Sequence, residues 1–130
     1  TYTYYGKEYP LHKDGDNSYF ITEDDTIYSA TEQMPEYKGG QKKLFEQISK
    51  VLKYPAEAKA NNIQGRVFIS FLITKKGELT DIVILKNVHE ILDEEAIRVV
   101  KQIPNNWNPG THNGKPVNTI FIMPLSFTLR

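Results

Sequence analysis

The stretch GRVFISFLITKKGELTDIVILK, residues 65–86, decides the fold. Both halves are rich in β-branched and aromatic residues, and the polar KKGE between them places Gly77 where a turn needs a left-handed residue. We therefore expect a β-hairpin that begins at Gly65. The first strand is apolar on both faces, as in a strand with two neighbours; its two rows are Val67, Ile69, Phe71 and Ile73, and Phe68 and Leu72.

Helical patterns flank the hairpin. Apolar residues recur at helical spacing within Gln41–Lys53, and Tyr54 and Pro55 then make a corner before a second, short helix, AEAKA. Residues 90–103 return to helical spacing. The acidic run Asp93 to Glu95 suits a solvated first helical turn, where it complements the helix dipole.

The C-terminal residues predict a long strand. From Val117 to Leu129 the odd-numbered residues are mostly apolar and form one core face. A right-handed crossover places this strand beside the first strand of the hairpin. We therefore expect an α+β fold whose three-stranded, antiparallel-type sheet has the order 2-1-3, with the helices on one face. The last strand is then an open edge, which agrees with Pro124, a residue largely confined to sheet edges.

The N-terminal residues have a different composition. Residues 1–30 hold six tyrosines and several turn signals, which predict a hairpin-like β-rich segment. Residues 31–40 read as a connecting loop, and residues 41–130 as the main domain. We expect residues 1–30 to dock on the apolar row that the helices leave uncovered, namely Phe68, Leu72, Ile120 and Ile122. Self-association of the chain is the competing use of that row.

Composition excludes several function classes. A chain of 130 residues with 39% hydrophobic content fits one folded domain. Lys plus Arg and Asp plus Glu are 16 each, so no excess positive charge favours nucleic acid. The absence of Cys removes disulfides and thiolate chemistry. No apolar run approaches the ~20 residues of a membrane span.

The sequence offers no enzymatic or metal-binding signature. The three histidines, His12, His89 and His112, lack metal-ligand spacing and read as surface residues. Asp24 and Asp25 read as turn residues. We therefore predict no catalytic residue, no metal and no cofactor.

One set of motifs resembles the C-terminal domain of TonB, the periplasmic energy transducer of Gram-negative bacteria. The set comprises YPAEAKANNIQGRVFISFLITKKGELTDIVILK, the helix that follows it, and WNPGTHNGKPVNTIFIMPLSF, and it covers roughly Met34 to Leu129. The MPEYKGG lead-in resembles the Bacteroidetes form of the family. Residues 1–30 match nothing known in it, and the membrane helix and Pro-rich spacer of the family are absent from this sequence.

The resemblance implies a binding function. Family members are driven by ExbB and ExbD through a membrane helix, cross the periplasm from the inner membrane, and pull on TonB-dependent outer-membrane transporters. Each transporter offers a short TonB box that adds as a strand to the last strand of the domain. We expect this chain to be periplasmic and to be anchored by a segment outside the sequence.

The expected partner-binding residues follow from that strand. They are Val117, Asn118, Thr119, Ile120, Phe121, Ile122, Met123 and Leu125, with the side chains of Asn118, Ile120 and Ile122 pointing outward. Structural roles are expected for Tyr54, Pro55, Gly65, Gly77, Trp107, Pro109 and Gly110. By the resemblance, Trp107 anchors the corner between helix and strand in the core.

A second function class stays open. An accessory, sensor or lipoprotein domain could use the same fold to bind a peptide or peptidoglycan without transmitting force. Neither the transporter nor its nutrient is readable from the sequence.

Overall fold

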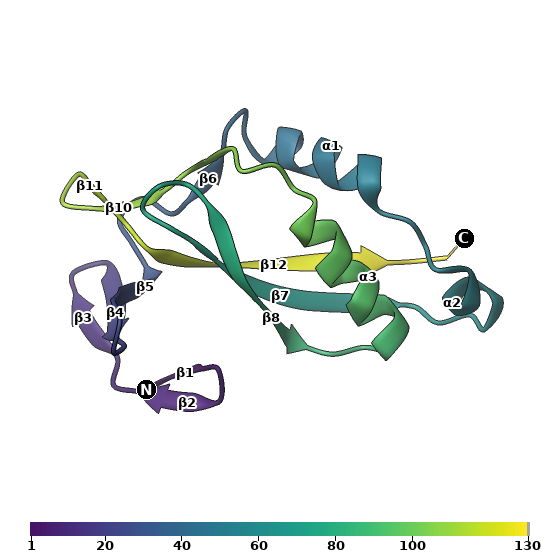
Figure 1. Ribbon diagram of the computed structural model, residues 1–130, viewed down its shortest axis with the longest axis horizontal. Helices are drawn as coiled ribbons and strands as arrows, with labels where there is room; N and C mark the ends of the chain where they lie inside the picture. The colour runs from purple at the N-terminus through teal and green to yellow at the C-terminus, as the bar shows by residue number, and fades with distance from the viewer. Residues whose placement is uncertain (130) are drawn as a thin grey trace. The chain divides into compact units, whose positions relative to one another are not determined.

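The computed structural model describes residues 1–129 (Figure 1). The chain forms two compact units. The first comprises Thr1–Lys38, Phe71–Asp81 and Asn105–Phe121, and the second comprises Gly39–Ser70, Ile82–Pro104 and the chain from Ile122 onward. Among the described residues, no helix has the length and apolar character needed to cross a membrane.

The main sheet has six strands, so the predicted three-stranded sheet is wrong in its size. The order is β3-β4-β5-β12-β7-β8, and the predicted 2-1-3 order survives within it as β8, β7 and β12. The strands are β3 (His12–Asp14), β4 (Asn17–Ile21), β5 (Thr26–Ala30), β7 (Gly65–Ile73), β8 (Leu79–Lys86) and β12 (Thr119–Phe127).

The larger size of the sheet has a simple cause. Segments that the sequence predicted only as short N-terminal strands supply three more members of the sheet, and β5 pairs with β12 in parallel. Strand β12 therefore lies between two neighbours and is not the outermost strand. Three antiparallel strand pairs complete the strands of the described chain: β1 (Tyr2–Tyr4) with β2 (Lys7–Tyr9), β6 (Glu36–Tyr37) with β9 (Trp107–Asn108), and β10 (Gly110–His112) with β11 (Lys115–Val117).

The N-terminal segment packs on the apolar row of the sheet within the first unit. Phe20 is fully buried and clusters with Ile27, Leu72 and Ile120. Three tyrosines close this cluster, with ring centroids 4.8 to 5.4 Å from that of Phe20: Tyr2, Tyr4 and Tyr9. The predicted docking of residues 1–30 is therefore confirmed at Leu72 and Ile120. The division of the chain at residues 30 and 40 stays a prediction.

Trp107 lies in a second aromatic cluster of the same unit. It is buried, and its ring meets Tyr37, Phe71 and Phe121 at centroid distances of 5.2, 5.6 and 5.2 Å. Edge-on aromatic contacts of this kind add to the free energy gained by burial. The indole Nε1 has no hydrogen-bond partner within residues 1–129. Within the described residues, the Trp107 side chain therefore contributes through its packing against these rings.

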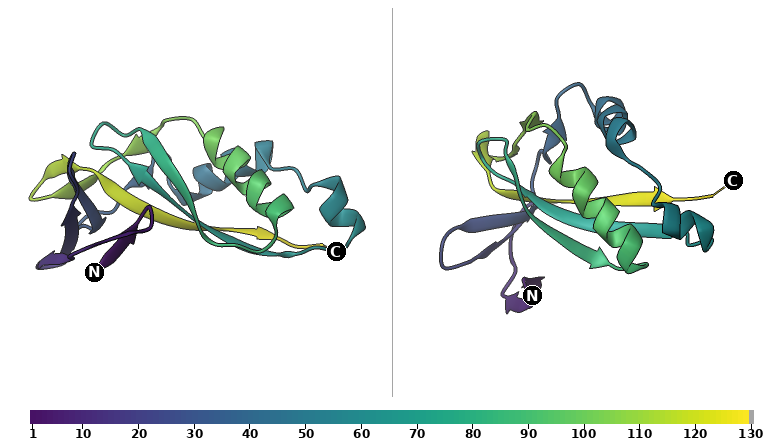
Figure 2. Two further views of the ribbon diagram at one scale, coloured as in Figure 1. Left: turned by 60° about the horizontal axis from the view of Figure 1, so that its bottom comes forward. Right: turned by 45° about the vertical axis from the view of Figure 1, so that its right-hand side comes forward.

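The second unit carries the helices. They are α1 (Gln41–Val51), α2 (Ala56–Ala60) and α3 (Glu90–Lys101). Figures 1 and 2 show α3 running across one face of the sheet strands, and α1 and α2 both contact α3. On β12 the residues Met123, Leu125 and Phe127 are buried, while the residues between them are exposed. The period of two therefore gives one core face, as predicted.

Glu95 departs from the solvated helical turn predicted for it. Its carboxylate is buried, accepts the Lys53 N–H at 2.7 Å, and pairs with the Arg98 guanidinium at 2.6 and 2.8 Å. Arg98 also donates to the Val51 carbonyl at 2.6 Å. Burial raises the pKa of Glu95, but the hydrogen bonds from Arg98 and Lys53 outweigh it, and the net pKa is lowered. This pair fastens the C-terminal end of α1 to α3.

Replacing Trp107 by Ala should destabilise the domain by about 3–5 kcal/mol, the usual cost of emptying a large buried aromatic site. Trp107→Phe should lose clearly less, because the ring contacts remain and no hydrogen bond is broken. Chemical denaturation of both variants measures the difference. Equal losses would show that the indole contributes more than packing.

Glu95→Gln should lower the melting temperature by a few degrees at neutral pH. The lowered pKa means that Glu95 stabilises the fold above the unfolded carboxylate value of about 4.3, and that this contribution is lost as the pH falls through the folded value. The variant should therefore show a shallower fall in stability below that pH. Glu94→Gln, on the exposed side of the same helical turn, is the matched control, and equal acid profiles for both variants would contradict the assignment.

Candidate functional site

The stretch WNPGTHNGKPV delivers the chain to the start of β12. After β9 it forms the β10–β11 hairpin, whose turn uses Asn113 and Gly114 at φ of 53° and 75°. Gly110 allows a close approach, because a Cβ at this position would lie 2.4 Å from Thr119 Oγ1. Pro109, just before it, is half-buried. These residues lead directly into β12, and the structural roles expected for Pro109 and Gly110 stay a prediction.

Asn118, between β11 and β12, joins three segments of the first unit. Its carbonyl accepts the Tyr28 N–H at 2.8 Å, which ties it to β5. Its side-chain Oδ1 accepts the Lys75 N–H at 2.9 Å, and its Nδ2 donates to Asp25 Oδ2 at 2.6 Å. A buried amide needs such partners, and here the main-chain carbonyl, Oδ1 and Nδ2 are all satisfied. We refer to this set of hydrogen bonds as the Asn118 junction.

The pairing of β5 with β12 is short. It consists of Thr119 opposite Tyr28, and β12 continues to Phe127. Because the Asn118 carbonyl faces β5 and strand backbone groups alternate with a period of two, the backbone groups of the following even-numbered residues face the same edge. No strand of the described chain pairs with this edge beyond Thr119. We refer to the stretch from Ile122 to Phe127 as the open edge of β12.

Pro124 has a clear place on this edge. As an even-numbered residue it faces away from β7, so its missing N–H breaks no hydrogen bond inside the sheet. Ile122 and Ser126 keep their N–H groups toward the same side. Ile122 is 52% exposed, which leaves an apolar side chain beside the open edge.

The eight predicted partner-binding residues lie in different environments. Val117 pairs with Gly110 in the β10–β11 hairpin, and Asn118 and Thr119 are held by β5. The predicted outward orientation is wrong for Asn118 and Ile120, which are 9% and 4% exposed. The remaining four residues lie on β12 beyond its paired start: Phe121, Ile122, Met123 and Leu125. Of these, Ile122 is exposed, whereas Met123 and Leu125 point into the core.

The residues expected to be structural occupy constrained positions. Tyr54 donates its hydroxyl proton to the Ile63 carbonyl and packs edge-on against Phe127, and Pro55 is the N-cap of α2. Gly65 and Gly77 have no room for a side chain: a Cβ would lie 2.4 Å from Val88 Cγ1 and 2.5 Å from the Trp107 carbonyl oxygen, respectively.

The histidines are placed by the structure without forming a metal centre. His112 Nε2 lies 3.3 Å from Asp14 Oδ2, and its ring packs on Tyr28 at 5.4 Å. His89 caps α3 by accepting the Ile91 N–H at 3.2 Å. Within residues 1–129, no three His, Asp or Glu side chains are grouped so that they could hold a metal ion.

Sequence reasoning missed Tyr28 and Asn118 as determinants of the edge. The sequence feature that could have indicated this role is the polar Asn118, which interrupts a strand-like run between Val117 and Thr119. A buried Asn usually holds backbone groups together. Its partners could not be named from spacing alone.

The family described as Gram-negative bacterial TonB protein C-terminal matches residues 50–129. The TonB proteins of two Helicobacter pylori strains, 26695 and J99, are each 30% identical over 90 residues, which cover 68% of this chain. The chain spans 30% of the length of these relatives.

Two solution structures are also similar. Both are NMR structures of the Helicobacter pylori TonB C-terminal domain, and each aligns with 68% of this chain. The first has 27% identity, a TM-score of 0.54 and 79% coverage of its own length. The second has 28% identity, a TM-score of 0.52 and 92% coverage.

Asn118→Ala should destabilise the protein by about 2–4 kcal/mol, because the Lys75 N–H and the Asp25 carboxylate both lose a partner. If the Asn118 side chain pointed outward, as the sequence predicted, the same substitution would have only a mild effect on stability. Asn108→Ala removes the same group from an exposed position and serves as the control. Thermal melts compare the two, and an unchanged melt for Asn118→Ala would contradict the Asn118 junction.

Proposed function

Because this chain belongs to the family of Gram-negative bacterial TonB C-terminal domains, we propose that it is the part of a periplasmic energy transducer that engages outer-membrane transporters. A transporter segment, the TonB box, adds as a strand along the open edge of β12. The transducer is anchored in the inner membrane and receives its force from ExbB and ExbD, as the resemblance implies. Strand addition of this kind requires no catalytic residue and no cofactor.

The open edge is the observation that carries this proposal. A row of backbone groups without a strand partner is a template for another strand. Strand β12 runs on past its pairing with β5. Its buried residues hold it against the core, so the edge is preformed and needs little ordering on binding. The receptive stretch therefore starts near Ile122, later than Val117.

The accessory-domain alternative uses the same fold differently. A domain that binds peptidoglycan without transmitting force would not need the open edge. A second copy of the chain is a further occupant to be tested, since edge strands also pair with one another. Both are outcomes of the experiment below.

Titration of the 15N-labelled chain with a TonB-box peptide from a transporter of the source organism tests the proposal. We expect amide shifts along Ile122 to Phe127 and an affinity on the order of micromolar or weaker, because a short peptide must be ordered on binding. Ile122→Pro should weaken binding by about tenfold, since it removes one edge donor and stiffens the strand. Ile122→Ala keeps the N–H and should bind more tightly than Ile122→Pro.

Pro124→Ala should have the opposite effect on the affinity for the peptide in the same titration. The exposed Pro124 is replaced by a residue with an N–H on the open edge, so binding should strengthen by about two- to fivefold. If the peptide shifts only the helices, or if Pro124→Ala and Ile122→Pro change affinity alike, strand addition is wrong for this chain. Binding of a peptidoglycan fragment without binding of the peptide would favour the accessory domain. Concentration-dependent shifts without any ligand would favour self-pairing.

A further inference from the structure

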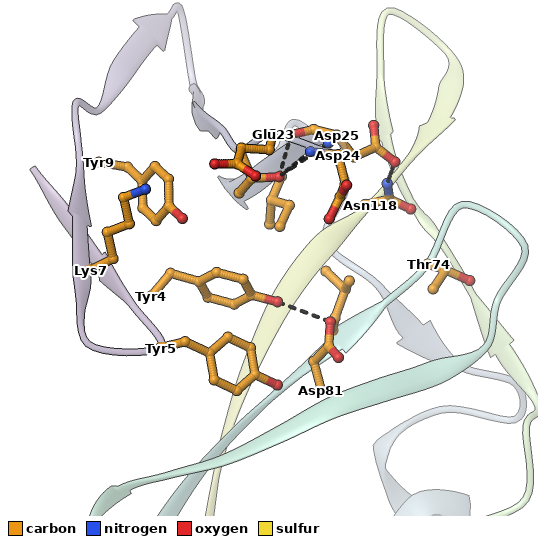
Figure 3. Close-up of a pocket in the computed structure, with 13 residues that line it drawn as sticks. Tyr4, Tyr5, Lys7, Tyr9, Glu23, Asp24, Asp25, Thr74, Asp81 and Asn118 are labelled. Atoms are coloured by element: carbon orange, nitrogen blue, oxygen red, sulfur yellow. Dashed lines mark hydrogen bonds between the residues drawn. The ribbon is translucent and has the colours of Figure 1, made fainter.

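A second, separate binding site is suggested by a cavity in the first unit (Figure 3). Its volume is about 660 Å³, within the range of small-ligand pockets. The walls come from the β1–β2 hairpin, the β4–β5 turn and residues of β7 and β8. No residue of the open edge of β12 belongs to the described lining, so the cavity and the strand-addition site use different residues.

One side of the cavity is aromatic. Tyr4, Tyr5 and Tyr9 line it (Figure 3), and Tyr4 and Tyr9 rest on the buried ring of Phe20 at 5.3 and 5.4 Å. The Tyr5 ring meets that of Tyr4 edge-on at 4.8 Å, yet Tyr5 is 61% exposed. An exposed aromatic ring held against others presents a rigid surface for a ligand.

The facing side is acidic. Four carboxylates line the cavity, those of Glu23, Asp24, Asp25 and Asp81. Among residues 1–129, the lining has Lys7 as its single cation, so the formal charge of this lining is four negative against one positive, a net −3. Two of the carboxylates are fixed: Asp25 by the Asn118 amide at 2.6 Å, and Asp81 by the Tyr4 hydroxyl at 3.0 Å. Burial, helped by Asp81, raises the pKa of Tyr4, so its hydroxyl stays a proton donor.

The position of Lys7 indicates independently which kind of chemical group the tyrosine side of the cavity binds. Its ammonium lies over the Tyr9 ring, 5.6 Å from the centroid, in a cation–π contact. In the part of the chain that the structure describes, it forms no ion pair with the four carboxylates. One tyrosine of the lining therefore already holds an ammonium group, while the carboxylates, among residues 1–129, have no cationic partner.

We propose that this cavity binds a lysine or arginine side chain presented by a peptide. A cation placed between the tyrosine rings and the carboxylates gains cation–π attraction and charge-assisted hydrogen bonds together. An anion is repelled by the net −3 lining, and a neutral sugar gains only the stacking and neutral hydrogen bonds. The alkyl stem of the ligand packs on Ile27 and Leu72, the apolar members of the lining.

NMR titration of the whole chain with acetyl-Ala-Lys-Ala-amide tests the proposal. We expect shifts confined to the Tyr4, Tyr9 and Asp24 region and an affinity on the order of millimolar, as suits one partly exposed cation. The same tripeptide with Nε-acetyl-lysine lacks the charge and should bind at least about fivefold more weakly. Ile122→Pro should leave this binding unchanged, so a failure here is distinguishable from a failure of strand addition.

Two variants with opposite expected effects on peptide affinity distinguish the loss of a binding charge from a structural defect. Asp24→Asn should weaken the lysine peptide by about two- to fivefold, and Lys7→Gln should strengthen it by a similar factor, because each changes one charge of the lining. Asp16→Asn, an exposed acidic residue outside this cavity, is the matched control and should leave affinity unchanged within about 1.5-fold.

Several outcomes would overturn the assignment. Equal binding of the acetylated peptide would remove the role of charge. Loss of affinity in Lys7→Gln as large as in Asp24→Asn would point to a structural effect. Shifts of the same residues by tri-N-acetylglucosamine, without any response to the lysine peptide, would make the cavity a sugar site. Tighter binding of spermidine than of a lysine peptide with the same charge would make the ligand a free amine.

Discussion

The hydrogen bonds of Asn118 fix the point at which strand β12 begins, and two other features depend on that point. A buried side-chain amide without partners would destabilise the fold by several kcal/mol, so Lys75 and Asp25 are held where they satisfy it. The main-chain carbonyl of the same residue holds Tyr28. The Tyr28 contact keeps β5 beside Thr119, which sets where the open edge starts. The Asp25 contact holds one carboxylate of the acidic cavity. One residue therefore limits the edge through its main-chain carbonyl and shapes the cavity through its side chain.

A second constraint is the two-faced apolar character of the central strands. A strand whose alternate rows are both apolar needs cover on both faces. In the first unit, Phe20 and Ile27 of the N-terminal segment bury Leu72 and Ile120. The same segment supplies β5, which pairs with the start of β12. Covering the face and shortening the open edge are therefore linked, because one stretch of chain does both.

Elements specified by local pattern were predictable from the sequence, and distant pairings were not. The hairpin around Gly77, the three helices and the core face of β12 follow from periodicity and turn chemistry. The docking of the tyrosine-rich segment followed from an apolar row that needed cover. By contrast, Asn118 meets Asp25 across 93 positions, and Glu95 meets Lys53 across 42. No spacing rule names partners at such separations, so both polar residues were expected at the surface although they are buried.

The number of free donors limits what the backbone of β12 contributes to binding. Thr119 is opposite Tyr28, and Pro124 has no N–H, so Ile122 and Ser126 supply the outward N–H groups of the open edge. At a net 0.5–1.5 kcal/mol for each hydrogen bond, roughly, two donors and the neighbouring carbonyls fall short of the ~8 kcal/mol of micromolar affinity. Side-chain contacts beside the exposed Ile122, or a tether that raises the effective concentration, must then supply the remainder. The matched family region covers residues 50–129, and β5 lies before it. Alignment over that region therefore does not show how much of the β12 edge is occupied by β5 in this chain.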